Sequence, residues 1–145
     1  MAHLRKVAVL LMYDSYGKIL LQKRGDLIKN KNLPEKLQRD YGMFGGGLEG
    51  KETFMQALAR EMNEELELDI KKLKNLEILR TAKIYIPELD MERDLTIFIA
   101  KMPDINKLKC HEGSPEIFTI PEALNLKISK TDKDTIKELA KRLKI

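Results

Sequence analysis

Six glutamates fall within residues 44–69, FGGGLEGKETFMQALAREMNEELELD, although the formal net charge of the 145-residue chain is +4. Three of them, Glu61, Glu64 and Glu65, follow three consecutive glycines in this stretch. Like charges three or four positions apart on a helix repel by roughly 0.2–0.5 kcal/mol per pair. Such a concentration of negative charge therefore calls for a positively charged partner.

The three carboxylates are predicted to lie on one side of a helix. At about 100° per residue they fall within an arc of roughly 100°, next to an apolar stripe of Phe54, Leu58 and Met62. The arc holds no lysine, whereas a helix face that only meets solvent normally mixes acids with lysines. Carboxylate oxygens are hard ligands that select Mg²⁺ or Mn²⁺ over zinc. The spacing favours a divalent-metal site, and the alternative is an acidic, solvent-exposed helix face.

The spacing of these residues resembles the Nudix box, G-x5-E-x7-R-E-aliphatic-x-E-E-x-G-aliphatic. The positions that match its polar and glycine residues at the required separations are Gly46, Glu52, Arg60, Glu61, Glu64 and Glu65. Met62 and Leu68 fill its two apolar positions. The chain departs from the pattern where Glu67 replaces a glycine and where Lys51 replaces the glycine that usually precedes the first glutamate. Both departures concern turn or helix-end geometry rather than metal ligands.

The resemblance implies a metal centre with Mg²⁺ or Mn²⁺ as the cofactor. Glu61, Glu64 and Glu65 would be ligands, together with the backbone carbonyl of Gly45. The implied cations bridge the phosphates and acidify a bound water. Glu64 and Glu65 are therefore predicted to be catalytic as well as metal-binding.

Three further residues are expected to support catalysis. Arg60 and Glu52 would pair and brace the glycine loop against the helix. The segment 111–113, His-Glu-Gly, resembles a downstream loop of MutT-like members, in which Glu112 would be a further metal ligand or the general base. The alternative for Glu112 is a solvated loop glutamate.

Three residues that precede the box are predicted to contact the substrate. Residues 18–24 resemble an early strand of the family, and its closing residue, Arg24, would face substrate phosphate. Tyr41 or Met43, in a segment similar to the family's aromatic-x-x-Pro-Gly-Gly sequence, would flank a nucleobase. An ordinary surface arginine and ordinary core packing are the respective alternatives.

Hydrophobic periodicity predicts the elements that position these residues. Strands are expected at 7–13, 19–22, 41–44, 76–86, 95–102 and 117–120, with a four-residue hairpin loop at 14–17 and a polar loop over 25–40. Helices are expected at 53–66, at 121–126 and from a cap at Thr131 to the end of the chain. The predicted fold class is α/β, a mixed β-sheet between helices, which agrees with the α/β/α sandwich that the resemblance implies.

Length, composition and charge limit the classes of function that fit this chain. The length fits one domain over residues 1–145, and no apolar run approaches the roughly 20 residues of a membrane helix. A single cysteine fits a cytoplasmic protein. The scattered lysines are interpreted as a solvated surface rather than a stable nucleic-acid interface. The partner is expected to be a nucleotide or other nucleoside diphosphate-linked small molecule, and the chain a monomer or homodimer.

The resemblance therefore implies a divalent-metal-dependent hydrolase of nucleoside diphosphate-linked compounds, a Nudix pyrophosphohydrolase acting on phosphoanhydride bonds. A MutT-like (deoxy)nucleoside triphosphate pyrophosphatase is the leading hypothesis. One alternative is a dinucleoside polyphosphate or RNA 5′-end pyrophosphohydrolase, since Tyr85 stands roughly where the former carry a tyrosine. The other is a non-catalytic Nudix binding module, which the complete set of box glutamates disfavours.

Overall fold

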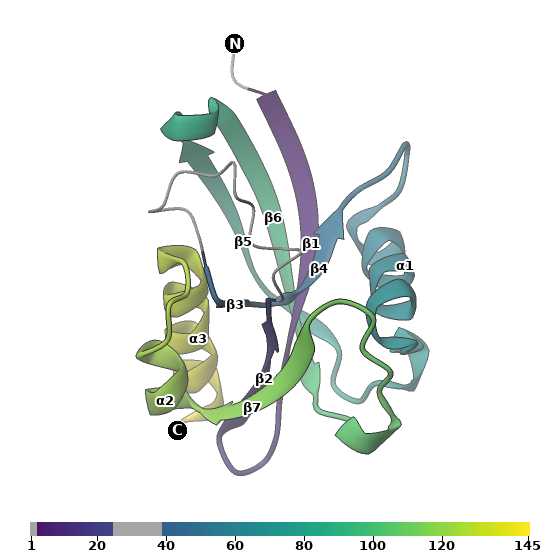
Figure 1. Cartoon of the computed structure of the whole chain (residues 1–145), viewed down its shortest axis with the longest axis vertical. Helices are drawn as coiled ribbons and strands as arrows, with labels where there is room; N and C mark the ends of the chain where they lie inside the picture. Colours follow the sequence, from purple (N-terminus) through teal and green to yellow (C-terminus); the bar gives the residue numbers. More distant parts are fainter. Residues whose placement is uncertain (1–2, 25–38) are drawn as a thin grey trace.

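The computed structural model describes residues 3–24 and 39–145, in which seven strands form one mixed sheet between helices (Figure 1). The strands are β1 (His3–Tyr13), β2 (Lys18–Lys23), β3 (Tyr41–Gly42), β4 (Phe44–Gly47), β5 (Glu77–Ile86), β6 (Met91–Lys101) and β7 (Ser114–Thr119). The helices are α1 (Phe54–Leu66), α2 (Ile120–Leu124) and α3 (Lys130–Leu143). Within these ranges, none of the helices is long and apolar enough to cross a membrane.

Strand β1 is the centre of the sheet. It pairs in parallel with β6 along its whole length and antiparallel with β2 and β4, while β7 pairs with β2 and β5 with β6. Side chains alternate across a strand, so Val9 and Leu11 pack in the layer under α3, and Leu10 and Met12 pack in the layer under α1. These two hydrophobic layers confirm the predicted sandwich. In Figure 1, α1 lies on one side of the sheet and α2 and α3 lie on the other.

The structure around the glycines differs from the prediction, which was a single strand over 41–44 followed by the glycines. Two strands are present: β3 ends at Gly42, and β4 runs through the glycines, with Gly45 opposite Val9 of β1. A Cβ at Gly45 would collide with the carbonyl oxygen of Ala8, and its φ is +142°. Gly45 is therefore required by the close approach of β4 to β1, whereas an added Cβ at Gly46 or Gly47 would meet the side chain of Glu61 or Arg5.

The start of the last helix also differs. Ser129, not Thr131, is its N-cap: the Ser129 hydroxyl accepts a hydrogen bond from the backbone N–H of Asp132 at 3.1 Å. Thr131 lies inside the first turn, where its carbonyl accepts a bond from Thr135. The predicted hairpin loop at 14–17 is confirmed between β1 and β2. Most of the predicted loop over 25–40 lies outside the described residues.

Candidate active site

Helix α1 places the acidic residues directly behind β4. Thr53 caps its N-terminus in a reciprocal capping box with Gln56, as the sequence predicts for Thr53. Its C-terminus ends at Glu67, which stands where the box has glycine and adopts a left-handed conformation with φ 50°. That conformation costs a non-glycine residue about 1–2 kcal/mol. The Glu67 carboxylate lies 2.7 Å from Nε2 of His111, a contact that holds the downstream loop against the helix end.

The second departure from the box, Lys51 in place of a glycine, does not prevent the turn before α1 from forming. Gly50, one position before Lys51, takes the left-handed conformation with φ +54° and has open space around its Cα. The Glu52 carboxylate then accepts the backbone N–H of Glu49 at 2.8 Å. The turn before α1 is therefore closed without a glycine at position 51.

Glu65 is the buried carboxylate of the site. Its side chain is 5% exposed, and its Oε2 accepts the backbone N–H of Gly45 at 3.1 Å. Burial, followed by the negative charges of Glu61 and Glu112, raises the pKa of Glu65 to about 8, against the opposing effect of the Gly45 N–H. A carboxyl group held in this way has a strong preference for an added positive charge.

Arg60 connects the helix to the glycine strand. Its Nε and Nη2 donate to the two oxygens of Glu52 at 2.9 and 3.0 Å, so the predicted pair forms. Nη2 also donates to the Gly47 carbonyl and Nη1 donates to Glu61, both at 2.9 Å. The bonds to Glu52 hold the pKa of Arg60 above its ordinary value and that of Glu52 below it. Arg60 thus contacts Glu61, while Glu64 remains exposed 3.4 Å from the same guanidinium.

The loop before β7 brings Glu112 to the same place. The backbone N–H of His111 donates to the carbonyl of Glu65 at 2.8 Å, so this loop satisfies a carbonyl at the C-terminal end of α1. Gly113 has a φ of +64°, and a Cβ there would collide with the carbonyl oxygen of Lys23 at the end of β2. The exposed Glu112 carboxylate therefore faces Glu65 closely enough to raise its pKa.

These carboxylates suit a divalent cation in chemistry and position. Glu61, Glu64 and Glu112 all act electrostatically on Glu65, and a Cβ at Gly46 would collide with the Glu61 carboxylate. In the described ranges, no three His, Cys, Asp or Glu side chains are already close enough together to hold an ion. The oxygens fit Mg²⁺ or Mn²⁺, but Glu61 and Glu64 would have to turn from Arg60 toward Glu65 to share it. Contact of the Gly45 carbonyl with an ion stays a prediction.

The three predicted substrate contacts lie on the α3 side of the sheet. The guanidinium of Arg24 lies against Gly42, where an added Cβ would be 2.8 Å from Nη2. Tyr41 packs edge-on against Phe118 and donates its hydroxyl proton to Glu116 at 3.0 Å. Met43 is 9% exposed in the core layer under α3. Both Tyr41 and Met43 thus have the core packing given as their alternative, and contact with a nucleobase stays a prediction.

Sequence reasoning missed a set of charged residues near Arg24. Arg5 of β1 and Arg93 of β6 are register partners, and Asp132 of α3 interacts electrostatically with Arg24 and Arg93. One signal was available in the sequence. Arg5 and Arg93 each stand two positions before the first residue of a buried apolar run, which predicts that each arginine points to the same face of the sheet as that first residue. Their proximity to each other depends on the pairing of β1 with β6.

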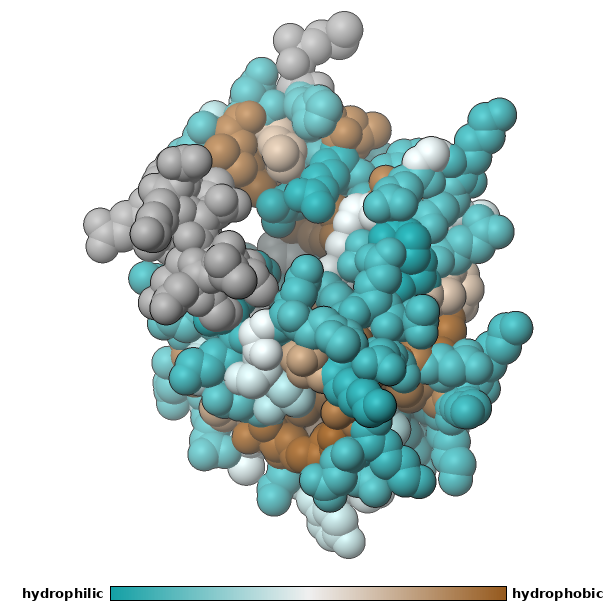
Figure 2. All heavy atoms as spheres, turned by 45° about the vertical axis from the view of Figure 1, so that its right-hand side comes forward, coloured by the Kyte–Doolittle hydropathy of each residue, from teal (hydrophilic) through white to brown (hydrophobic). Residues whose placement is uncertain are grey.

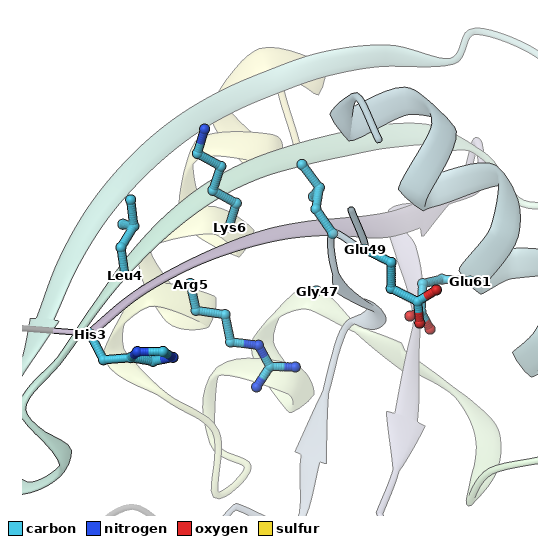
Figure 3. Close-up of a pocket in the computed structure, with 8 residues that line it drawn as sticks. His3, Leu4, Arg5, Lys6, Gly47, Glu49 and Glu61 are labelled. Atoms are coloured by element: carbon cyan, nitrogen blue, oxygen red, sulfur yellow. The ribbon is translucent and has the colours of Figure 1, made fainter. Parts of the chain in front are cut away.

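A pocket of about 450 Å³ joins the acidic site to this basic region. Arg5, Gly47, Glu49 and Glu61 are among its lining residues, and Figure 3 shows Arg5 leaving β1 on the opposite side from Lys6. Such a volume lies within the usual range for a small-molecule site, about 300–1,000 Å³. Figure 2, which brings the α1 side forward, shows that hydrophilic side chains cover most of this face.

Solved structures share this fold. Over 99% of this chain and 98% of the other, it superposes on a MutT protein from Methanosarcina mazei with a TM-score of 0.73 and 15% identity. An Ap4A hydrolase from C. elegans gives 0.71 and 17% over 97% and 98% of the two chains. A dihydroneopterin triphosphate pyrophosphohydrolase from E. coli gives 0.69 and 18% over 98% and 99%.

At these identities the likeness shows the fold alone, and no curated protein sequence matches the chain significantly. The family model described as NUDIX domain, however, matches residues 2–139. This match includes the box glutamates, the arginine that braces them and the loop that carries Glu112. Since it covers nearly the whole chain, the protein belongs to the Nudix family, whose members are pyrophosphohydrolases acting on phosphoanhydride bonds.

Proposed function

We propose that this Nudix enzyme hydrolyses nucleoside diphosphate-linked compounds with Mg²⁺ or Mn²⁺ bound at Glu61, Glu64 and Glu65. The observation that carries the proposal is the buried Glu65 carboxyl group, which lies against Gly45 with its pKa raised to about 8 among other carboxylates. This arrangement is unfavourable without a cation, and the pyrophosphate of a substrate brings negative charge that the same cation would neutralise.

When bound, the cation would supply electrostatic stabilisation of the phosphates and a more acidic water. The protein's own groups have distinct parts in this proposal. The Gly45 N–H orients the Glu65 carboxylate, and Arg60 braces the glycine strand through Glu52 and the Gly47 carbonyl. Glu112 is exposed beside Glu65 and is the candidate general base that takes a proton from the attacking water.

Within this reaction class, a MutT-like (deoxy)nucleoside triphosphate pyrophosphatase remains the leading candidate. It is supported by the Glu112–Gly113 loop and by fold neighbours whose names include MutT proteins. A cytoplasmic site of action follows from such a substrate. A binding module without activity is disfavoured because Glu61, Glu64 and Glu65 are all retained at the site.

A substrate screen tests this proposal. The purified protein would be incubated with nucleoside triphosphates, dinucleoside polyphosphates and nucleoside diphosphate sugars, each with Mg²⁺, with Mn²⁺ or with a chelator, and the products would be identified. We expect metal-dependent cleavage of a phosphoanhydride bond that releases a nucleoside monophosphate. A folded protein that cleaves none of these compounds with either metal, yet binds one of them, would establish the binding module instead.

A further inference from the structure

A group of charged side chains lies on the α3 side of the sheet, away from the carboxylates of the metal site. It consists of Arg5, Arg24 and Arg93 around Asp132, and is called the arginine cluster below. Arg93 interacts electrostatically with Arg5, Arg24 and Asp132. Asp132 in turn interacts with Arg24, Arg39 and Arg93. Four segments distant in sequence therefore bring these three guanidinium groups together, and two of them act on the Asp132 carboxylate.

The sheet and α3 aim these side chains at one space. Arg5 precedes Val7 by two residues and Arg93 precedes Leu95 by two, so both point to the face whose core lies under α3. Paired strands lie about 4.8 Å apart, which makes the register partners Arg5 and Arg93 direct neighbours. Asp132 lies in the first turn of α3, one turn before its buried residues. The beginnings of β1 and β6 extend past this end of the helix (Figure 1).

Among the described residues, the cluster has Asp132 as a nearby negative charge, but Arg5, Arg24 and Arg93 have no direct side-chain partner. The Nε atoms of Arg24 and Arg93 are buried without a hydrogen-bond partner. In the described part of the chain, no side-chain hydrogen bond or ion pair engages Arg5, Arg24 or Arg93. Burial, then the charges of Arg5 and Arg24, lower the pKa of Arg93. Desolvated like charges are unfavourable unless an opposite charge joins them.

One member of the cluster, Arg5, reaches the pocket beside the metal site. Arg5 and Glu61 line the same pocket, and an added Cβ at Gly47 would lie 3.1 Å from Nε of Arg5. A substrate whose diphosphate lies at the carboxylates can therefore extend along Gly47 toward Arg5. An uncharged nucleobase at this end would leave the guanidinium groups without an anionic partner.

We propose that the arginine cluster binds a second phosphate group of the substrate, apart from the diphosphate that is cleaved. The preferred substrates are then diphosphate-linked compounds phosphorylated at another position as well. A phosphate monoester carries about −1.5 to −2 charge at pH 7 and offers oxygens that match the planar fork of arginine. Three guanidinium groups beside one carboxylate suit such a dianion. This inference rests on the proposed hydrolase function and narrows its substrate class.

Matched substrate pairs test it. The ratio of kcat/KM between NADPH and NADH, and between coenzyme A and its dephospho form, isolates the additional phosphate, which in both cases is a monoester. We expect ratios of about 10 to 100 in favour of the phosphorylated member for at least one pair. Arg93→Gln should lower that ratio toward 1, and Arg5→Gln is the second variant if Arg93→Gln does not fold. Lys101→Gln removes an exposed charge from the far end of β6 and should leave the ratio unchanged.

A binding experiment tests the arginine cluster independently of hydrolysis. With a chelator present, the melting temperature of the protein is measured in inorganic phosphate and in chloride of equal ionic strength. Stabilisation by phosphate that Arg93→Gln reduces and Lys101→Gln does not reduce would support the cluster as an anion site even without turnover. Ratios near 1 for pairs that are hydrolysed would overturn the inference and leave the hydrolase proposal standing. If no pair is hydrolysed, equal phosphate stabilisation of wild type and Arg93→Gln would overturn it.

Discussion

At the residue scale, Glu65 is the side chain whose charge matters most to the proposed chemistry. Glu65→Gln keeps the shape and helix propensity of the residue but removes a carboxylate from the site. We expect turnover with Mg²⁺ to fall by about 10²- to 10³-fold, the typical cost of losing one key electrostatic contact to a transition state. Steady-state kinetics on a substrate found in the screen measures this loss.

The melting temperature of metal-free Glu65→Gln distinguishes this effect from damage to the fold. It should equal or exceed that of the wild type, because burial and the charges of Glu61 and Glu112 disfavour an ionised carboxylate at this position and an amide carries no charge. Glu138→Gln on α3 is the matched control, an exposed helix glutamate far from α1, and should retain full activity. Equal activity of Glu65→Gln and wild type would falsify the assigned role of Glu65.

Asp132 has a separate consequence for stability. Burial raises its pKa from an ordinary 3.8 to about 6, although Ser129 and the positive charges of Arg24, Arg39 and Arg93 act in the opposite direction. Between these pH values the folded protein binds more protons than the unfolded chain, so this residue's contribution to the free energy of unfolding decreases as pH rises from about 4 to about 6. Asp132→Asn should remove that contribution. Denaturant titrations of both proteins across this range give the difference, and parallel pH profiles would contradict the assignment.

At the element scale, the pairing of β4 with β1 places the site. Gly45→Ala should prevent native folding, because its Cβ would collide with the Ala8 carbonyl at φ +142°. Gly50→Ala is the matched control: its φ is +54° with no atom near the added Cβ, so only about 1–2 kcal/mol of backbone strain is expected. Yield of folded protein and melting temperature compare the two. Equal tolerance of both substitutions would show that the close approach of β4 to β1 is not required.

At the scale of the whole molecule, the fold and the metal site are separable. Two hydrophobic layers on either side of β1 hold the sandwich together, and the carboxylates lie at the edge of the α1 layer. We therefore expect a chelator to abolish hydrolysis while circular dichroism stays native, and excess Mg²⁺ or Mn²⁺ to restore activity. Loss of native dichroism in the chelator, regained with metal, would instead make the ion a structural component.

Much of the site could be predicted because its geometry is local. Residues 60–65 lie on consecutive turns of one helix, so spacing alone places Glu61, Glu64 and Glu65 together, and the Thr53 cap marks the start of that helix. The two layers also follow from alternation along β1. Predictions were weaker where a boundary depends on pairing, as at Gly45, or on which of two nearby hydroxyls caps a helix, as at Ser129.

The sequence by itself therefore determined the family, the sandwich and the acidic helix, since each follows from residue types at short, fixed separations. Only the tertiary structure decided what faces that helix from elsewhere in the chain. The His111 N–H bonded to the Glu65 carbonyl brings Glu112 into the site, and the β1–β6 register makes Arg5 and Arg93 neighbours. Local propensity does not specify such contacts, because a strand's preference for extended backbone is the same whichever partner it pairs with.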